Sequence, residues 1–300
     1  AQDSATGFRA IANLQLRREH SRDEAMDRIS SSGASSESSP AEVRYAYLHG
    51  FASGPQAVKG LMLQSCFLSA DLDLALPDLN MPSFGALTFS EALRVLDRMD
   101  ASARELAGSP ILWRLIGSSM GAYLAARWAG LRPDSVDRLV LLSPAFDFAN
   151  LIRSLAGGGA AMQRWQEEGF WSCPGPDGAL ARLHWGFVED MSRHPPAPEV
   201  PCPTLVLHGS RDTLVPAECA QLVVGRRPDS VRLVTVDDDH ALVKSMPQIV
   251  HSIAEFFAIE GGLPPPPQPP SRQVHQFDHS IDAPPRSRDA PGGSDTTRSR

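Results

Sequence analysis

Residues 111–126 read Ile-Leu-Trp-Arg-Leu-Ile-Gly-Ser-Ser-Met-Gly-Ala-Tyr-Leu-Ala-Ala. The apolar start of this stretch favours a strand, and its alanine-rich end favours a helix. Between them, residues 117–121 form a Gly-x-Ser-x-Gly motif, which predicts a sharp turn with the Ser119 hydroxyl pushed out of the backbone. Gly117 and Gly121 are needed because a side chain at either position would collide with the neighbouring strand or helix. Ser118 is the alternative exposed serine, but only Ser119 has a glycine two residues away on both sides.

Strand and helix patterns alternate on both sides of this motif. Short apolar runs rich in β-branched residues predict strands at 43–48, 73–76, 112–116, 138–142, 204–207 and 232–236. Helical patterns lie at 57–68, 90–106, 122–129, 217–224 and 248–259. This order predicts an α/β fold with a mostly parallel, doubly wound sheet that helices cover on both faces. Ligands of such sheets bind at the carboxyl ends of the strands.

The composition limits the class of partner. The chain has 300 residues, is 42% hydrophobic and carries a formal charge of −7, which argues against nucleic acid and acidic membranes as partners. No apolar stretch approaches the roughly 20 residues of a membrane span, and the first residues lack a signal-peptide pattern, so we expect a cytoplasmic protein. The scattered cysteines predict free thiols at Cys66, Cys173, Cys202 and Cys219.

Polar segments flank the part of the chain that can fold. A serine-rich run at 30–40 follows a highly charged stretch, so we expect residues 1–40 to be disordered or marginally helical. A run of prolines and a polar tail predict disorder over 261–300, a kind of segment that an SH3-type domain can bind. The globular domain is therefore expected at 41–260.

Chemically active side chains follow several of the predicted strands. A His-Gly loop follows the first strand, Ser119 the third, Asp212 the fifth and His240 the last. The chain order Ser, Asp, His is that of α/β-hydrolases. A serine hydroxyl is a weak nucleophile, so we expect His240 to be its base and Asp212 to orient the imidazole.

The run Asp237-Asp238-Asp239 before His240 is a second source for the acid. Adjacent side chains on an extended segment point to opposite sides, so Asp239 is expected to face away from the histidine. Asp238 shares the side of His240, and we expect it to be a surface charge that reaches the ring poorly. Asp212 is therefore the preferred acid.

These motifs resemble the α/β-hydrolase superfamily over residues 43–260. Within it, His49-Gly50-Phe51, the following Ser53-Gly54-Pro55-Gln56, Lys59 and the run Leu76–Asn80 resemble the bacterial YqiA-type esterases. The resemblance implies an oxyanion hole made by the backbone N–H groups of Met120 and Phe51.

A long stretch separates the strands predicted at 138–142 and 204–207. In this fold such an insertion commonly forms a cap, and we expect a helical one at about 147–200. We expect its tryptophans, Trp165, Trp171 and Trp185, to line an apolar substrate pocket. The alternative is that these rings only pack the insertion onto the domain.

Several polar residues are expected to serve structure alone. We expect His49 and His208 to hydrogen-bond locally and shape their loops, and Lys59 to be solvated or to brace a loop. No metal site is expected at the aspartates that alternate with leucines without a neighbouring His or Cys, namely Asp71, Asp73 and Asp78.

Two functions therefore remain. The first is a serine hydrolase that needs no cofactor and cleaves a small-molecule carboxylic ester, thioester or aminoacyl amide through an acyl-enzyme. The second is a non-catalytic α/β-hydrolase scaffold that binds a ligand or a protein partner. The presence of both glycines, Ser119, Asp212 and His240 favours the first.

Overall fold

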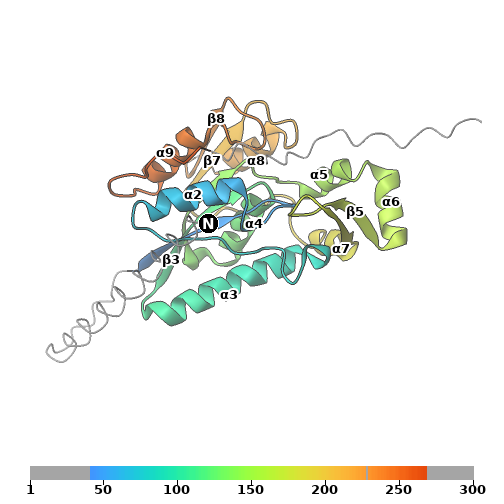
Figure 1. The fold of residues 1–300 in the computed structure, drawn as a ribbon, viewed down its shortest axis with the longest axis horizontal. Coiled ribbons are helices and arrows are strands. Elements are labelled where there is room, and N and C mark those ends of the chain that lie inside the picture. The colour runs from blue at the N-terminus through green and yellow to red at the C-terminus, as the bar shows by residue number, and fades with distance from the viewer. Residues whose placement is uncertain (1–40, 228, 269–300) are drawn as a thin grey trace, which may run out of the picture. The chain divides into compact units, whose positions relative to one another are not determined.

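A parallel six-stranded sheet is the centre of the fold (Figure 1). The computed structural model describes residues 41–227 and 229–268, so the predictions for residues 1–40 and 269–300 lie outside it. The strand order is β2-β1-β3-β4-β7-β8, and all neighbouring strands run parallel. The strands are β1 (Glu42–Leu48), β2 (Leu74–Ala75), β3 (Ile111–Ser118), β4 (Val136–Leu142), β7 (Thr204–Gly209) and β8 (Val231–Val236).

Successive residues of the central strands pack on opposite faces of the sheet. On β4, Val140 belongs to one apolar cluster, whereas Leu139 and Leu141 belong to the other. Every residue of β7 is buried. Strands buried on both faces require nearly continuous apolar runs, which explains why the sequence predicts them.

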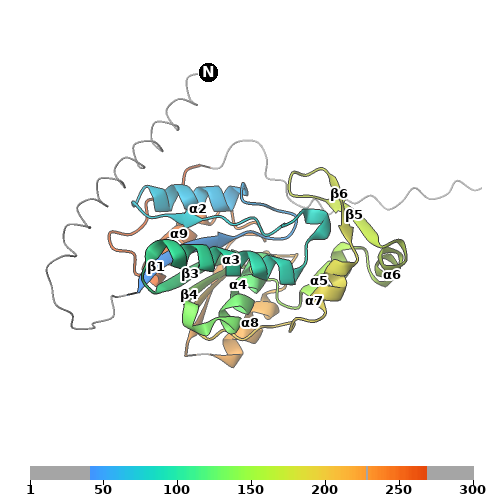
Figure 2. The same cartoon turned by 90° about the horizontal axis from the view of Figure 1, so that it is seen from below.

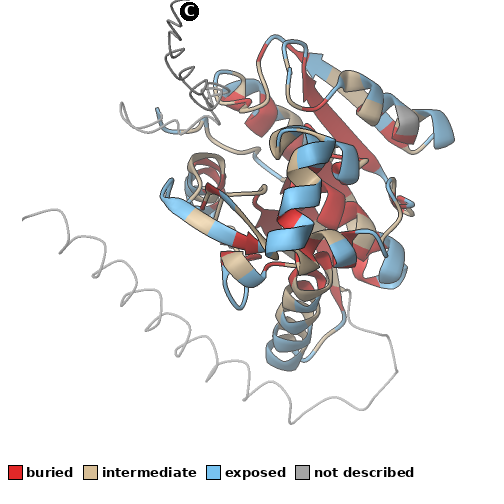
Figure 3. Cartoon of the chain, turned by 90° about the vertical axis from the view of Figure 1, so that its right-hand side faces the viewer, coloured by how far each residue is buried: buried red, intermediate tan, exposed pale blue. Residues whose placement is uncertain are grey.

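Helices cover both faces of this sheet (Figures 2 and 3). One apolar cluster joins the sheet to α2 (Val58–Leu68) and α9 (Met246–Phe256), and the other joins it to α3 (Phe89–Ala107), α4 (Met120–Leu131) and α8 (Ala217–Arg226). The predicted strands and helices are all present, with ends shifted by a few residues. The doubly wound α/β prediction is therefore confirmed.

An insertion between β4 and β7 lies beyond the carboxyl edge of the sheet (Figures 1 and 2). It contains α5 (Phe148–Leu155), α6 (Gly159–Glu168), β5 (Phe170–Pro174), β6 (Leu180–His184) and α7 (Gly186–Met191). The two strands form an antiparallel hairpin. A helical insertion was expected, and the helices are present, but the β5–β6 hairpin was missed. The mostly exposed and half-buried residues of these short strands carry little apolar alternation from which strands could be predicted.

A buried carboxylate fastens this insertion to α3. Asp190 of α7 accepts hydrogen bonds from Ser90 N at 2.9 Å and Ser90 Oγ at 2.6 Å, in the first turn of α3. First-turn N–H groups have no partner inside their helix, so the carboxylate satisfies one of them. His194 Nε2 lies 3.5 Å from Asp190 Oδ2 and 3.3 Å from Ser90 Oγ. We call Ser90, Asp190 and His194 the α3 cluster.

The cysteines carry free thiols, as the sequence predicts. Burial raises the pKa of Cys173 to about 12 and the pKa of Cys202 to about 11, so both thiols stay protonated at neutral pH. Cys66 is buried as well, and Cys219 is half-buried. In the part of the chain that the structure describes, no helix combines the length and the apolar character that crossing a bilayer requires.

Candidate active site

Ser119 occupies the sharp turn between β3 and α4. Its φ of 56° and ψ of −116° lie in a region that residues with a side chain rarely adopt. A Cβ at Gly117 would lie 2.5 Å from Ala122 Cα, and a Cβ at Gly121 would lie 2.1 Å from Leu48 O. Both glycines are therefore required for the close approach of the helix and the neighbouring strand, as the motif predicts.

The adjacent Ser118 has a different environment. It is the last residue of β3, is almost fully buried, and forms a side-chain hydrogen bond with Tyr47. Burial raises the pKa of Tyr47 above its ordinary value, so this phenol stays protonated. The strained turn thus distinguishes Ser119 from its neighbour.

Asp212 and His240 meet at the ends of β7 and β8. His240 Nδ1 lies 2.8 Å from Asp212 Oδ2, while Asp212 Oδ1 accepts hydrogen bonds from Leu214 N at 3.0 Å and Val215 N at 2.8 Å. Burial raises the pKa of the Asp212 carboxyl, but the hydrogen bond and charge of His240 outweigh burial and hold the pKa below its ordinary value. The carboxylate is therefore fixed, ionised and paired with one imidazole nitrogen. We call Ser119, Asp212 and His240 the elbow cluster.

The aspartates before His240 have other partners. Asp237 is exposed and forms ion pairs with nearby basic side chains. Asp238 is only 4% exposed and accepts hydrogen bonds from Asp239 N at 2.9 Å and Ser245 N at 2.8 Å. The expectation that Asp238 is a surface charge is wrong, because its carboxylate holds the backbone of this loop together.

The loop after β1 passes beside Ser119. A Cβ at Gly50 would lie 3.4 Å from Ser119 Cβ and 4.0 Å from Ser119 Oγ. Met120 begins α4, so its N–H has no carbonyl partner within the helix. Phe51, the other expected oxyanion donor, directly follows Gly50. The two expected donors therefore belong to two backbone segments that lie beside the serine.

The Phe51 side chain packs in a cluster of aromatic rings. Its ring centroid lies 5.4 Å from Phe84, 5.9 Å from Phe148 and 5.7 Å from Phe187. Phe148 and Phe187 belong to α5 and α7 of the insertion. The loop beside Ser119 is thus packed directly against the insertion.

His49 and His208 shape their loops, as expected. Leu79 N donates to His49 Nε2 at 3.0 Å, so Nδ1 carries the proton and donates to Gly50 O at 3.0 Å. Burial lowers the pKa of His49 and keeps this ring neutral. His208 Nε2 lies 2.9 Å from Val215 O, in the loop that carries Asp212.

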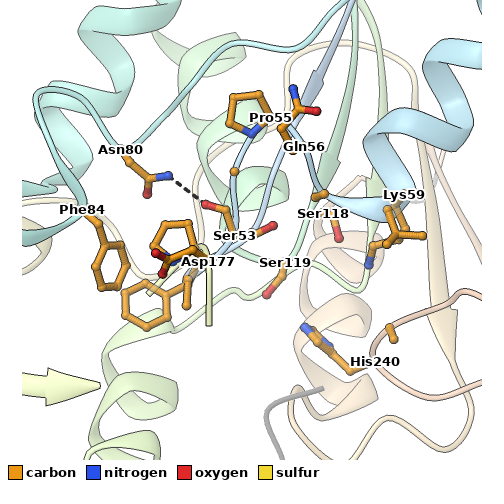
Figure 4. Close-up of a pocket in the computed structure, with 18 of the residues that line it drawn as sticks. Ser53, Pro55, Gln56, Lys59, Asn80, Phe84, Ser118, Ser119, Asp177 and His240 are labelled. Carbon is orange, nitrogen blue, oxygen red and sulfur yellow. Dashed lines mark hydrogen bonds between the residues drawn. The ribbon is translucent and has the colours of Figure 1, made fainter. Parts of the chain in front are cut away.

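A cavity of about 1000 Å³ opens in front of Ser119 and His240 (Figure 4). It lies between the ends of β1 and β3, where the strand order changes direction, and this is the usual ligand site of open α/β sheets. The apolar part of its lining includes Phe51, Phe84, Leu151, Leu155, Leu214 and Val243. Cavities of this size and character suit small organic ligands.

The insertion contributes to this cavity, but its tryptophans do not line it in the described structure. Trp165 is buried and packs against Trp171 and Trp185 at centroid distances of 5.2 and 5.6 Å. Its Nε1 donates to Leu183 O at 3.0 Å. The rings hold the insertion together, while α5 and the hairpin turn supply the lining residues Leu151, Leu155, Pro176 and Asp177.

Lys59 lies in this cavity, although it was expected to be solvated or to brace a loop. Its side chain extends from the first turn of α2, and Figure 4 shows its nitrogen directed toward the space between Ser118 and His240. In the sequence, Lys59 closely follows Gly54-Pro55 and lies in the first turn of the helix predicted at 57–68. This position, after a loop that follows a strand end, is a signal that could have placed Lys59 at the site. Among the described residues, no group of three or more His, Cys, Asp and Glu side chains could hold a metal ion.

Comparison with known proteins places the chain in a family. The profile of the uncharacterised protein family UPF0227 matches residues 44–258, which is well over half of the sequence. The chain belongs to this family. The match confirms the resemblance to the YqiA-type proteins of the α/β-hydrolase superfamily. The curated proteins yield no match.

Solved structures of α/β-hydrolases share the fold. Est1E from Butyrivibrio proteoclasticus with bound ferulic acid has a TM-score of 0.60 at 17% identity, covering 72% of this chain and 88% of Est1E. Mouse alpha/beta hydrolase domain-containing protein 10 has a TM-score of 0.54 at 18% identity, covering 75% and 91%. The monoacylglycerol lipase of Paleococcus ferrophilus has a TM-score of 0.52 at 17% identity, covering 72% and 97%. This UPF0227 member therefore has the α/β-hydrolase fold.

Proposed function

We propose that this protein is a serine hydrolase that cleaves carboxylic esters through an acyl-enzyme on Ser119. The observation that carries the proposal is the shared cavity, into which a serine on a strained turn and the Asp212-paired His240 both open. Two proteins of similar structure, a monoacylglycerol lipase and Est1E with bound ferulic acid, are consistent with ester chemistry.

Acylation begins with attack of Ser119 Oγ on the ester carbonyl carbon, while the hydroxyl proton passes to His240 Nε2. Asp212 orients the ring through Nδ1 and stabilises the imidazolium. The tetrahedral oxyanion accepts hydrogen bonds from the Met120 and Phe51 N–H groups, each worth about 3 kcal/mol. The bond to the alcohol oxygen then breaks, and His240 gives its proton to that oxygen.

Deacylation repeats these proton transfers with water. Water attacks the acyl carbon, and one of its protons passes to His240 Nε2. The carbon–Oγ bond breaks, and His240 returns the proton to Ser119 Oγ, which releases the carboxylic acid and restores the free enzyme. Ser119, His240, Asp212 and the two backbone N–H groups account for every bond change and proton transfer in this cycle, and no cofactor is needed.

The lining of the cavity favours small or medium esters with an apolar portion. Phe51 and Phe84 flank one part of it, and Leu151 and Leu155 of α5 bring the insertion into contact with the ligand. The insertion then acts as a cap that shields the acyl-enzyme from bulk water. Thioesters and aminoacyl amides use the same chemistry and belong in the first substrate panel.

The experiment that tests this proposal combines labelling and turnover. A fluorophosphonate probe, followed by peptide mapping, should place the label on Ser119, and p-nitrophenyl esters of short acyl chains should be hydrolysed. Thioesters and aminoacyl amides assayed in parallel rank the three substrate classes. A folded protein that takes no label and turns over none of the panel would instead be a non-catalytic scaffold.

A further inference from the structure

Lys59 is the only lysine or arginine among the described residues that line the active-site cavity. Its position follows from the packing of the next residue. A Cβ at Gly60 would lie 3.0 Å from the Tyr47 ring, so the absence of a side chain lets the first turn of α2 sit tightly against β1. The neighbouring Lys59 then extends into the cavity (Figure 4).

Among the residues that the structure describes, no salt bridge is formed by the Lys59 ammonium. The carboxylates of Asp212, Asp238 and Asp239 attract it from a distance. Asp212 is already bonded to His240, and Asp238 to two backbone N–H groups. The cavity thus contains a cation whose nearest negative charges are engaged elsewhere.

This cation is half-buried, which increases its affinity for an anion. Burial lowers the pKa of Lys59 to about 8, and the three aspartates oppose that shift, so the amine is mostly protonated at neutral pH. A charge taken out of water gains more from a paired anion than an exposed charge does. An anionic ligand group in the cavity would supply the missing partner.

Lys59 and several large apolar side chains of the lining come from different elements of the fold. Tyr47, Lys59 and Ser118 lie where β1, α2 and β3 meet, whereas Phe84, Leu151 and other apolar side chains come from the loop before α3 and from the insertion. A substrate that spans the two sides would be apolar at one end and charged at the other, with its ester near Ser119.

We propose that Lys59 binds an anionic group of the substrate, so that the preferred esters carry a carboxylate close to the scissile bond. This assignment rests on the proposed esterase function and names its substrate class. Lys59 acts here as a specificity-determining residue and takes no part in the proton transfers of the elbow cluster.

The test compares esters matched in size and differing in charge, using the full-length chain. On the acyl side these are the p-nitrophenyl monoester of glutaric acid and p-nitrophenyl valerate. On the alcohol side they are the butyrate ester of 4-hydroxybenzoate and the butyrate ester of methyl 4-hydroxybenzoate. We expect one anionic member to be preferred in kcat/KM. Lys59→Met should lower its kcat/KM by roughly 10- to 100-fold, the range for a hydrogen bond to a charged group, and leave its neutral partner within about threefold.

Three controls accompany this comparison. Lys59→Arg keeps the charge and should retain most of the preference. Lys244→Met removes the other lysine of the chain, which is exposed and pairs with Asp237, and it should leave the preference unchanged. Thermal unfolding of each variant separates a loss of recognition from a loss of folded protein, with Lys59→Gln as a second neutral variant.

The pH dependence gives an independent readout. The kcat/KM for the anionic ester should fall as pH rises through about 8, because Lys59 loses its proton, whereas the value for the neutral ester should not follow this ionisation. The other ionisable groups around Lys59 act on both esters and cancel in the ratio. They are Tyr47, Asp78, Asp177, Asp212, Asp238, Asp239 and His240.

Equal effects of Lys59→Met on the anionic and neutral esters would overturn the proposal, because Lys59 would then support the elbow cluster rather than the substrate. A wild-type enzyme without preference in either pair would overturn it as well. Failure of the esterase function itself is distinguishable, since neither ester of a pair would then turn over. In that case calorimetry with glutarate decides, and equal binding by wild type and Lys59→Met would overturn anion recognition.

Discussion

The elbow cluster and the α3 cluster each contain a serine, an aspartate and a histidine, but the aspartate binds a different partner in each. In the elbow cluster the carboxylate pairs with the histidine, at 2.8 Å between Asp212 Oδ2 and His240 Nδ1. In the α3 cluster the carboxylate accepts a hydrogen bond from the serine hydroxyl, at 2.6 Å between Asp190 Oδ1 and Ser90 Oγ. A serine whose hydroxyl already donates its hydrogen bond to a carboxylate cannot at the same time donate it to a histidine.

The surroundings differ as much as the bonds. Ser119 lies on a strained turn at the edge of the cavity, whereas Ser90 lies in the regular first turn of a helix and does not line the cavity. Asp212 is held by two loop N–H groups and remains free to orient a ring. Asp190 instead accepts hydrogen bonds from Ser90 in the first turn of α3. Residue types alone therefore do not decide whether a serine can act as a nucleophile. The partner that the aspartate binds, and the access of the serine to a ligand, decide it.

The largest expected difference between the clusters concerns their serines. Ser119→Ala should lower kcat by a factor on the order of 10⁴ or more with little change in Tm, because it removes the proposed nucleophile. Ser90→Ala should leave kcat within about twofold, since its hydroxyl only donates a hydrogen bond to the Asp190 carboxylate and lies outside the cavity lining. Ester turnover and fluorophosphonate labelling measure both. Labelling of Ser118 in Ser119→Ala, with appreciable turnover, would move the nucleophile by one residue.

The next largest effect concerns the acid. Asp212→Asn should lower kcat by about three to four powers of ten, because the histidine loses its orienting carboxylate. Asp238→Asn should cost at most about tenfold in kcat, but about 1–3 kcal/mol of stability, because its buried carboxylate accepts two backbone hydrogen bonds. Steady-state kinetics and chemical denaturation separate the two effects. If the two variants exchanged ranks in kcat, Asp212 would not be the acid.

The aspartate of the α3 cluster should affect stability alone. Asp190→Asn should cost about 1–3 kcal/mol, because it weakens charge-assisted bonds to the Ser90 hydroxyl and N–H. Below the unfolding transition kcat should stay within about threefold of wild type. Thermal unfolding and kinetics at a lower temperature check this. A kcat loss as large as that of Asp212→Asn would mean that the α3 cluster takes part in the chemistry.

The smallest effect concerns pH and stability. Burial lowers the pKa of His194 from its ordinary value of 6.5, with Asp190 opposing the shift. The unfolded chain therefore takes up this proton first, and the contribution of His194 to stability falls as pH drops through about 6.5. Unfolding free energies measured from pH 7.5 to 5 should have a shallower slope in His194→Gln than in wild type. Identical slopes would show that His194 titrates alike in both states.

Much of this fold follows from local sequence patterns. The strands at 112–116 and 204–207 are apolar because both faces of the sheet are covered, and the elbow glycines are spaced by the strand–turn–helix geometry. Ser119, Asp212 and His240 follow the carboxyl ends of β3, β7 and β8, which lie along one edge of the sheet. Parallel-sheet topology makes this juxtaposition predictable without coordinates.

The cavity lining did not follow from sequence in the same way. Trp165 packs against the two other tryptophans of the insertion, and these rings join α6 and the hairpin to the apolar cluster on one face of the sheet. The sequence predicts Lys59 to be a surface residue. Its place in the cavity depends on the close packing of Gly60 against the Tyr47 ring. Both outcomes depend on contacts between segments distant in sequence, for which local periodicity carries no signal.

The ring cluster around Phe51 couples the insertion to the loop beside Ser119, so the insertion cannot be exchanged without affecting that loop. Phe148 and Phe187 of the insertion contact the side chain whose backbone N–H is proposed to bind the oxyanion. Exchanging the whole insertion for that of another α/β-hydrolase, as a route to new substrates, would therefore also disturb the loop beside Ser119. A transplant that keeps these two phenylalanines and varies the hairpin turn would leave that loop supported, so the turn is the part of the insertion that can be exchanged most independently.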